Sequence, residues 1–229
     1  MICVIDYGAG NLRSVENALQ YLDVPFTVTS QAAEVAEAAA ILLPGVGHFG
    51  QMMRSLDVLG LASILRGAIT RGVPYLGICL GMHALFEGSE EAPAWPGLAI
   101  LPGRVRRIPE GLKVPHMGWN QLQMAPGSRL FVGIASSPFV YFAHSYYVPW
   151  EGFASSGQSA QPAALADYGT LFVAAVEKDN ICGVQFHPEK SGEIGLEMLR
   201  NFAREAEAVK DTRTPPARKS PSQRDSRAG

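Results

Sequence analysis

The chain has 229 residues, of which 47% are hydrophobic and 17% are charged, and its formal net charge is −2 at neutral pH. This length and composition suit one sizeable core, and the low charge gives no drive toward nucleic acid or an anionic membrane. No apolar run approaches the ~20 residues of a membrane span, and no basic segment with a hydrophobic region opens the chain. We therefore expect a cytoplasmic protein with neither a nucleic acid nor a membrane as partner.

Three cysteines, Cys3, Cys79 and Cys182, occur without a Cys-x-x-Cys pair. An odd number at such spacings argues against a disulfide framework and against a zinc site, so we expect no metal. We also expect no cofactor. Cys3 and Cys182 lie in apolar runs typical of strands, where cysteine packs as a small apolar residue. Cys79 lies in a different context, described below.

The first part of the chain alternates strand and helix patterns. Strands are predicted at 2–6, 26–30, 40–44 and 73–78, and helices at 11–22, 32–38 and roughly 49–71. This rhythm predicts an α/β fold with an open, mainly parallel central sheet and helices on both faces.

After about residue 98 the pattern changes to strands and turns. Strand-like segments at 98–109, 114–124, 139–148 and 171–176 predict an antiparallel β extension, and residues 192–208 form a closing helix. Residues 152–157 and 159–162 are rich in Gly, Ser and Pro and predict a surface loop.

One domain is predicted over residues 1–208, followed by a disordered tail over 209–229. From Asp211 onward the tail holds five basic and two acidic residues and no apolar residue larger than alanine. Such a segment cannot bury enough surface to offset its ordering entropy. A nucleic-acid-binding tail is the alternative, which so few charges disfavour.

The loop Gly8-Ala9-Gly10 follows the first strand and opens a helix capped by Asn11, as in dinucleotide sites. The third glycine of that motif would fall at Arg13. About 20 residues further on, Ser30 and Gln31 stand where an acidic ribose ligand is needed. The dinucleotide interpretation therefore fails.

Cys79 lies in Gly77-Ile78-Cys79-Leu80-Gly81, directly after an apolar run typical of a buried parallel strand. The pattern Gly-x-Cys-x-Gly is the cysteine form of a nucleophile elbow. Glycines on both sides allow a sharp turn, and a helix start behind it presents free N–H groups and favours a thiolate. A cysteine in an apolar strand is also often plain core, which is the competing interpretation.

Another apolar run, residues 181–186, ends in His187-Pro188-Glu189. In extended chain, side chains two residues apart lie on one face, so Glu189 can orient the imidazole of His187. The imidazole can then exchange a proton with a thiol and with a leaving group. A solvated turn is the alternative.

The segment Pro44-Gly45-Val46-Gly47 follows the apolar run 40–43, at the edge where open α/β sheets bind ligands. Two glycines there permit a backbone N–H to turn toward the oxyanion of an acyl-transfer intermediate. An ordinary strand-to-helix turn is the alternative.

Together these motifs resemble the class I, or triad, glutamine amidotransferases, and within them the glutaminase subunits of imidazole glycerol phosphate synthase. The resemblance spans residues 1 to about 202 and rests on the elbow and on the segments 6–12, 43–49, 115–120, 144–147 and 187–191. It implies a Cys79, His187 and Glu189 triad that hydrolyses glutamine to glutamate and ammonia. It also implies an oxyanion hole made by Val46 or Gly47 with the amide of Leu80.

The resemblance further implies a separate (β/α)8-barrel cyclase subunit that forms a heterodimer with this chain and uses the ammonia to make imidazole glycerol phosphate in histidine biosynthesis. Residues expected to contact glutamine are Gly45, His48, His83, His144, Ser145 and Tyr146. Residues expected at the subunit interface are Asn11, His116, Trp119, Asn120 and Lys190. Core packing is an alternative for Trp119 and Tyr146, and a solvated side chain for Lys190.

The chain departs from the family pattern at His83, where members usually carry a glutamine that contacts the substrate. A neutral imidazole donates or accepts one hydrogen bond at each nitrogen, whereas a carboxamide does both from one group. We expect this difference to affect affinity for glutamine. The resemblance leaves open sister amidotransferases that serve anthranilate, aminodeoxychorismate or guanylate synthesis, and a binding subunit that has lost turnover.

Overall fold

The computed structural model describes residues 1–9, 11–154 and 161–213. The strands are β1 (Ile2–Ile5), β2 (Phe26–Thr29), β3 (Ala40–Gly45), β4 (Tyr75–Cys79), β5 (Gly88–Ser89), β6 (Arg104–Arg107), β7 (His116–Gln121), β8 (Gln123–Met124), β9 (Phe139–His144), β10 (Tyr146–Tyr147), β11 (Gln161–Asp167), β12 (Leu171–Lys178) and β13 (Ile181–Val184). The helices are α1 (Leu12–Tyr21), α2 (Ala32–Ala36), α3 (Phe49–Val58), α4 (Leu61–Thr70), α5 (Leu80–His83), α6 (Trp150–Ala154), the 3-10 turn η1 (Pro188–Lys190) and α7 (Gly192–Arg213).

Eight of these strands form the central sheet in the order β2-β1-β3-β4-β13-β12-β11-β8. The pairs from β2 to β13 are parallel, and those from β13 to β8 are antiparallel. The predicted fold class, a mainly parallel sheet with an antiparallel extension, is therefore confirmed. Two smaller sheets, β10-β6-β5 and β7-β9, complete the extension.

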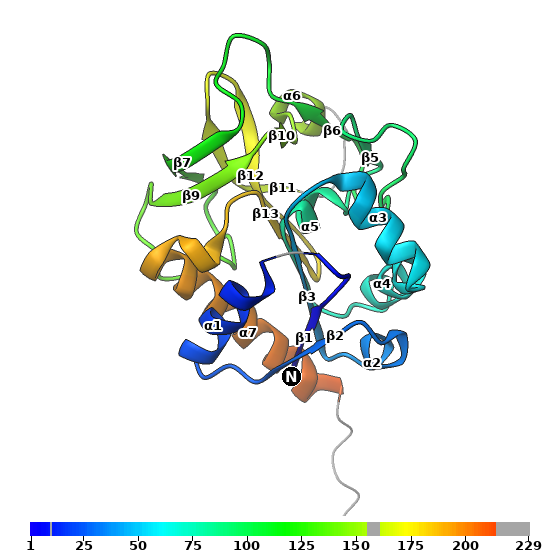
Figure 1. Ribbon diagram of the computed structural model, residues 1–229. Helices are drawn as coiled ribbons and strands as arrows, with labels where there is room; N and C mark the ends of the chain where they lie inside the picture. The colour runs from blue at the N-terminus through cyan, green and yellow to red at the C-terminus, as the bar shows by residue number, and fades with distance from the viewer. Residues whose placement is uncertain (10, 155–160, 214–229) are drawn as a thin grey trace, which may run out of the picture.

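The central strands are buried on both faces, which explains their unbroken apolar runs. Along β1, Ile2 and Val4 pack into a core with α1 and α7, whereas Cys3 and Ile5 pack into a second core with α3 and α4. This alternation follows from the two-residue period of a strand. Figure 1 shows α1 and α7 on one side of the sheet and α2 to α4 on the other.

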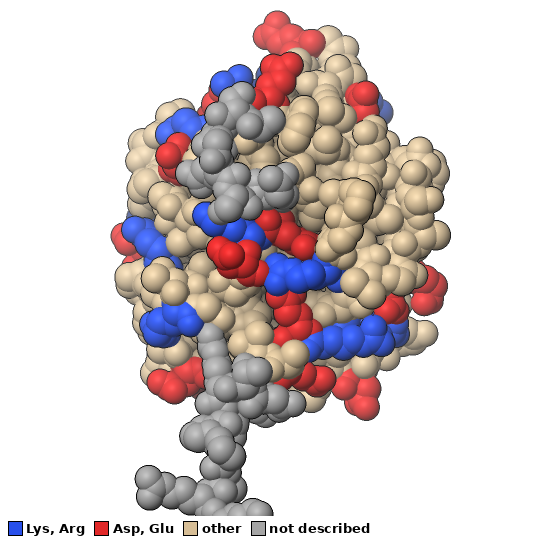
Figure 2. Space-filling view, turned by 180° about the vertical axis from the view of Figure 1, so that it is seen from behind, with Lys and Arg blue, Asp and Glu red and all other residues tan. Residues whose placement is uncertain are grey.

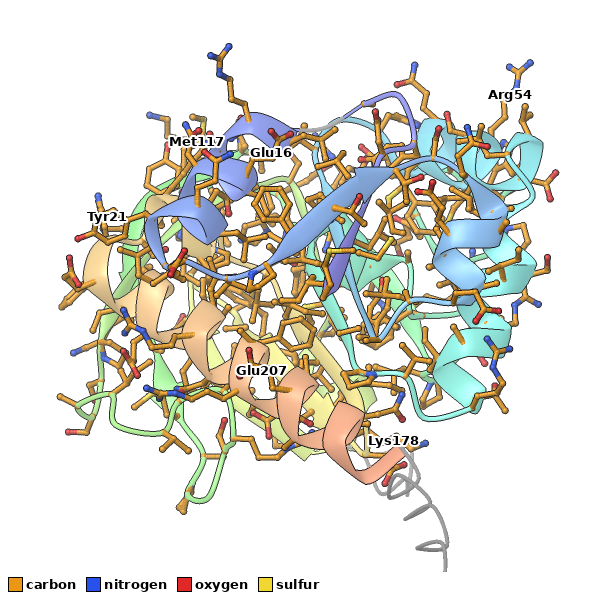
Figure 3. All side chains as sticks on the ribbon, turned by 90° about the horizontal axis from the view of Figure 1, so that it is seen from below. Glu16, Tyr21, Arg54, Met117, Lys178 and Glu207 are labelled. Atoms are coloured by element: carbon orange, nitrogen blue, oxygen red, sulfur yellow. The ribbon has the colours of Figure 1, made fainter. Side chains whose placement is uncertain are left out.

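The same layers are visible from below, where Tyr21 of α1 and Arg54 of α3 project from opposite sides of the molecule (Figure 3). On the face drawn in Figure 2, basic and acidic side chains are interspersed rather than separated into patches of one sign. None of the helices that the structure describes is long and apolar enough to cross a membrane.

The single helix predicted over 49–71 is two helices, α3 and α4, so that prediction was wrong. Gly60 stands between them with φ 68°, and its N–H donates to Asp57 O at 2.9 Å. A left-handed glycine just past the last turn is a common helix stop. The apolar pattern continues across the break because both helices bury their faces in the same core.

The loop predicted around 152–162 is partly regular structure. Gly152 lies in α6, and Gln161 and Pro162 open β11, while residues 155–160 lie outside the described part of the chain. β11 reads Gln-Pro-Ala-Ala-Leu-Ala-Asp, which has low strand propensity, and it forms because it pairs with both β12 and β8.

The closing helix α7 runs to Arg213 instead of ending at Ala208, so residues 209–213 of the predicted tail are helical. The remainder of that tail, 214–229, lies outside the described residues. Within α7, Met198, Leu199 and Phe202 are buried in the core that α1 also shares.

Candidate active site

Cys79 is the last residue of β4 and has φ 52° and ψ −104°. A non-glycine residue in this region is strained, and such strain clusters at functional sites. Cys79 is 6% exposed, and it lines the pocket described below. The geometry is that of the nucleophile elbow predicted from the sequence.

The glycines of the elbow are required because three backbone segments cross there. A Cβ on Gly77 would lie 2.4 Å from Gly81 O, and a Cβ on Gly81 would lie 1.9 Å from Leu43 O. A Cβ on Gly45 would lie 2.6 Å from Leu80 Cβ. Tyr75 adds a hydrogen bond from its hydroxyl to Gly81 O at 2.9 Å. The close approach of β3, β4 and α5 therefore fixes where the sulfur points.

His187 and Glu189 meet the nucleophile from the end of β13. His187 Nδ1 lies 2.9 Å from Glu189 Oε1, and both side chains are almost fully buried. The two residues are joined across the 3-10 turn η1 rather than along extended chain as predicted. His187 N–H donates to Tyr141 O at 2.9 Å, and Ser191 Oγ donates to His187 O at 2.6 Å, which anchors the turn.

The imidazole of His187 is hydrogen-bonded to Glu189 and lies close enough to Cys79 for that side chain to act on its pKa. Burial lowers the pKa of His187, but the interactions of the ring with Cys79 and Glu189 outweigh burial and raise the pKa to about 10. Near neutral pH the ring of His187 is therefore protonated, so it can give a proton to a leaving group.

A pocket of about 180 Å³ opens beside Cys79. This volume is below the roughly 300 Å³ at which drug-sized sites begin, so it suits a ligand of about amino-acid size. Of the residues predicted for the site, the pocket is lined by Val46, Gly47, Cys79, Leu80, His83, His144, Ser145 and Tyr146. Gly47 has φ 99°, and Leu80 is the first residue of α5, whose N–H groups have no partner within the helix.

Two residues predicted to contact substrate lie elsewhere. His48 is exposed and caps α3, with Nδ1 accepting from Gly50 N–H at 3.1 Å. Gly45 is buried at the end of β3 against the elbow and does not line the pocket. His48 therefore positions the helix after the glycine loop, and Gly45 positions the elbow.

Sequence reasoning missed two polar groups of the site. Glu91 lines the pocket, and its Oε2 accepts from Phe49 N–H at 2.8 Å. Gln185 is fully buried between Cys79 and His83. A polar residue inside the apolar run 181–186 was the available signal for Gln185, whereas nothing local marks Glu91.

His144 and His116 form a buried hydrogen-bonded pair, with His116 Nδ1 lying 3.0 Å from His144 Nε2. His144 Nδ1 lies 2.8 Å from Tyr146 O, and Asn120 Nδ2 lies 3.4 Å from His116 Nε2. Because a carbonyl only accepts, each ring donates from Nδ1 and accepts at Nε2. His116 was predicted at the interface, but its side chain is only 3% exposed and stacks on Phe142 and Tyr168.

The buried histidines predict a loss of stability in acid. Burial lowers the pKa of His83 to about 4 and that of His144 to about 3. Unfolding restores an ordinary pKa near 6.5, so below that pH the unfolded chain binds more protons than the folded chain. The stabilisation that the two neutral histidines contribute is therefore fully present above pH 6.5, and it is lost as the pH falls toward 4 for His83 and toward 3 for His144. Denaturant unfolding between pH 7 and 4.5 should show this, and His83→Gln should reduce the slope by up to about 1.4 kcal/mol per pH unit. Equal slopes for the two proteins would contradict the assignment.

Other residues predicted at the interface gather on one face of the β7–β9 hairpin. Trp119 is 56% exposed and packs edge-on against Tyr141, with 6.2 Å between the ring centroids. Lys190 Nζ lies 5.9 Å from the centroid of the Tyr141 ring. Met117 and Phe139, also exposed, lie on this face as well. We refer to Met117, Trp119, Phe139, Tyr141 and Lys190 as the hairpin face.

Asn120 points to the opposite face of β7 from Trp119, and Asn11 lies at the start of α1. Asn120 Nδ2 donates to Asp167 O at 2.8 Å, so its carboxamide ties β7 to the end of β11. Asn11 is half-buried at the start of α1, and its Oδ1 accepts from Ser14 Oγ at 2.9 Å. Gly10 lies outside the described residues. Within the part of the chain that the structure describes, no group of three or more His, Cys, Asp or Glu side chains is placed to hold a metal ion.

Comparison with known proteins identifies relatives over most of the chain. The family model Glutamine amidotransferase class-I matches residues 3–206. Imidazole glycerol phosphate synthase subunit HisH of Methanothermobacter thermautotrophicus is 49% identical over 202 residues, which cover 88% of this chain and 97% of that protein. The HisH proteins of Moorella thermoacetica and Aquifex aeolicus are each 47% identical, covering 88% and 90% of this chain and 93% and 97% of their own lengths.

Solved structures of similar fold include one described as a glutamine amidotransferase, with a TM-score of 0.71 and 19% identity over 90% of this chain and 100% of that chain. The structure of PurLQS from Thermotoga maritima has a TM-score of 0.67 and 19% identity over 89% of this chain and 97% of its own. At this identity the likeness concerns the fold alone. From the family model and the relatives, the chain belongs to the class I glutamine amidotransferases, in the branch of the imidazole glycerol phosphate synthase subunits HisH.

Proposed function

We propose that this chain is the glutaminase subunit of imidazole glycerol phosphate synthase and that Cys79, His187 and Glu189 are its catalytic triad. The observation that carries the proposal is the grouping of the three side chains, in which Glu189 Oε1 lies 2.9 Å from His187 Nδ1 and Cys79, whose proximity acts on the pKa of His187, lines a small pocket. A thiolate, a proton donor and an orienting carboxylate in this order are what amide cleavage requires.

In the first half of the reaction, the Cys79 thiolate attacks the side-chain amide carbon of glutamine and forms a C–S bond. The amide N–H of Leu80, with that of Val46 or Gly47, holds the oxyanion of the tetrahedral intermediate. His187 gives its proton to the amide nitrogen, the C–N bond breaks, and ammonia leaves a glutamyl thioester. In the second half, His187 takes a proton from water, the water oxygen attacks the thioester carbon, the C–S bond breaks, and glutamate and the Cys79 thiolate form.

Polar groups of the pocket suit an amino-acid substrate. The Glu91 carboxylate is placed to accept from the α-ammonium of glutamine, and one of its oxygens already accepts from Phe49 N–H. His83 Nδ1 is buried and has no partner among the described residues, so it remains available to a donor of the bound substrate. His144, Ser145 and Tyr146 form the facing wall.

A partner subunit follows from the family, since the relatives are named as subunits of a synthase. We assign its docking site to the hairpin face, because exposed apolar side chains grouped on one surface indicate an interaction site. The pocket lining includes Met117 and Ala143, which pair across β7 and β9. A barrel cyclase docked there would cover the pocket and receive ammonia before water protonates it. Lys190 at the edge of the face would pair with an acidic group of the cyclase.

We further propose that the glycine loop gates turnover. Gly47 is exposed and its positive φ is accessible to glycine, so one peptide can rotate between a resting and an oxyanion-binding orientation. Occupation of the cyclase would then favour the second orientation. The proposed location is the cytoplasm, where histidine biosynthesis takes place.

The test measures glutamate release by the chain alone, with the cyclase, and with the cyclase and its nucleotide substrate. We expect little release by the chain alone and a rise at each step. Equal rates in all three would contradict the gate but leave the glutaminase, whereas no release in any of them would contradict the glutaminase. Capture of a chorismate-using enzyme rather than a barrel cyclase by the immobilised chain would place it in a sister pathway.

A further inference from the structure

Gln185 is a fully buried polar side chain that connects the nucleophile to helix α5. Its Nε2 donates to the Cys79 sulfur at 3.6 Å, and its Oε1 lies 2.7 Å from His83 Nε2. Its backbone N–H donates to Ala174 O of β12 at 2.8 Å, which fixes the residue directly after β13. Burying a carboxamide is unfavourable unless its groups are paired, so both side-chain contacts hold this arrangement in place.

The charge on the sulfur determines which end of this carboxamide faces Cys79. When His187 holds the proton, the thiolate is only an acceptor, and it favours the amide N–H over the carbonyl oxygen. Oε1 then faces His83, so the Nε2 of that ring carries a hydrogen and donates it. Since burial lowers the pKa of His83 to about 4, the ring is neutral at pH 7, and its Nδ1 is bare. This assignment agrees with the absence of any described partner for that nitrogen.

We propose, building on the glutaminase function above, that Gln185 is a further catalytic residue whose amide N–H stabilises the Cys79 thiolate, and that His83 is a positioning residue that holds the Gln185 carboxamide in the donating orientation. The hydrogen bond is strongest while sulfur is anionic, before attack, and again when the thiolate leaves during hydrolysis of the thioester. It therefore acts on the nucleophile and not on substrate binding.

The departure at position 83 is explained by the same contact. Histidine here and the glutamine usual in the family both offer an N–H donor from a side chain one turn after the nucleophile. A glutamine at position 83 would therefore be able to donate to Gln185 Oε1 in the place of His83. Leucine, which has a similar apolar volume and no donor, would leave Oε1 of Gln185 unpaired in a buried site.

Other titratable groups near the sulfur do not interfere with a measurement near neutral pH. Burial raises the pKa of Tyr7 to about 12 and lowers the pKa of His144 to about 3. Neither group changes charge between about pH 5 and 9. A pH profile of thiol reactivity in this window therefore reports on the coupled Cys79 and His187 pair.

The experiment follows alkylation of the full chain by iodoacetamide as a function of pH, with the modified cysteine identified by mass spectrometry and Cys79→Ser as the background. We expect Gln185→Met, which keeps the length but removes the donor, to raise the pH midpoint of alkylation by about one unit, a tenfold loss of thiolate stabilisation. His83→Leu should raise it in the same direction, and His83→Gln, which restores a donor, should match the original chain.

Steady-state kinetics with the cyclase provide the second readout. For Gln185→Met we expect kcat to fall about tenfold at pH values below the alkylation midpoint of the original chain and to recover at higher pH, with KM unchanged, because only the ionisation of the nucleophile is altered. An unchanged alkylation midpoint in Gln185→Met, or a His83→Gln variant that behaves like His83→Leu, would overturn the proposal.

These results separate the inference from the proposed function. If the original chain with the cyclase hydrolyses glutamine and the midpoint does not move, the role of Gln185 is wrong and the glutaminase stands. If the midpoint moves as expected and no glutamate is released under any condition, the hydrogen bond to the thiolate stands and the substrate is another.

Discussion

Replacing Cys79 with alanine is expected to reduce glutamate release by at least about ten-thousandfold, because removal of a nucleophile disables both halves of the reaction. The backbone conformation at position 79 is more strained for alanine than for glycine. Alanine carries the same Cβ as cysteine, however, so the strain is unchanged from the original chain and the fold should persist. The measurement is glutamate release in the complex with the cyclase, together with the unfolding midpoint of the variant. Retained hydrolysis in a folded Cys79→Ala protein would exclude the triad.

Cys182→Ala is the matched control for this variant. Cys182 lies on β13 and pairs in register with Leu76 of β4, so it belongs to the same sheet, but its side chain is buried in the core. The substitution removes one sulfur atom from a packed interior, and we expect a small loss of stability with full activity. A comparable loss of activity in both variants would point to a packing effect instead of chemistry.

Gly81→Ala is expected to lower the free energy of unfolding by about 3 kcal/mol and to remove most of the activity. Its new Cβ would lie 1.9 Å from Leu43 O, and since the obstacle is backbone, no side chain can swing away. Separating β3 from α5 by even about 1 Å displaces the sulfur from His187, a shift that costs on the order of 100-fold in rate. Denaturant unfolding and glutamate release measure the two effects.

Gly67→Ala makes the same chemical change, but we expect it to raise stability slightly instead of lowering it. Gly67 lies inside α4, where a Cβ would meet only the end of the flexible Arg71 side chain at 3.2 Å. Alanine in a helix interior is favoured over glycine by about 0.5–1 kcal/mol, so this variant should be slightly more stable and fully active. If Gly81→Ala proved as stable as Gly67→Ala, the crossing of backbone segments at the elbow would be incorrectly described.

The local sequence pattern was sufficient to predict the parts of the fold that are determined by residues close together in the chain. The buried runs of β1, β3 and β4 could be recognised because strands covered on both faces must be continuously apolar. The elbow could be recognised because Gly77 and Gly81 leave room for backbone contacts that any side chain would fill. Both features depend on neighbours within a few residues.

The features that the sequence did not predict depend on contacts between residues far apart in the chain. β11 has little intrinsic strand preference and is formed by pairing with β12 and β8, which local propensity does not reveal. Likewise, Gln185 and His83 are 102 positions apart, and their contact arises only when β13 packs beside α5. His48 was predicted to contact substrate, but its ring turns back and caps its own helix.

The two cores on either side of the sheet have no buried residue in common, and at the elbow, as along β1, neighbouring residues belong to different cores. Cys79 packs into the core of α1 and α7, whereas the next residue, Leu80, packs into the core of α3 and α4. A single peptide bond thus spans both hydrophobic compartments. A substitution that repacks one core should leave the helices of the other core in place but should displace the Cys79 sulfur. The rate of glutamine hydrolysis should therefore respond to packing changes in either core.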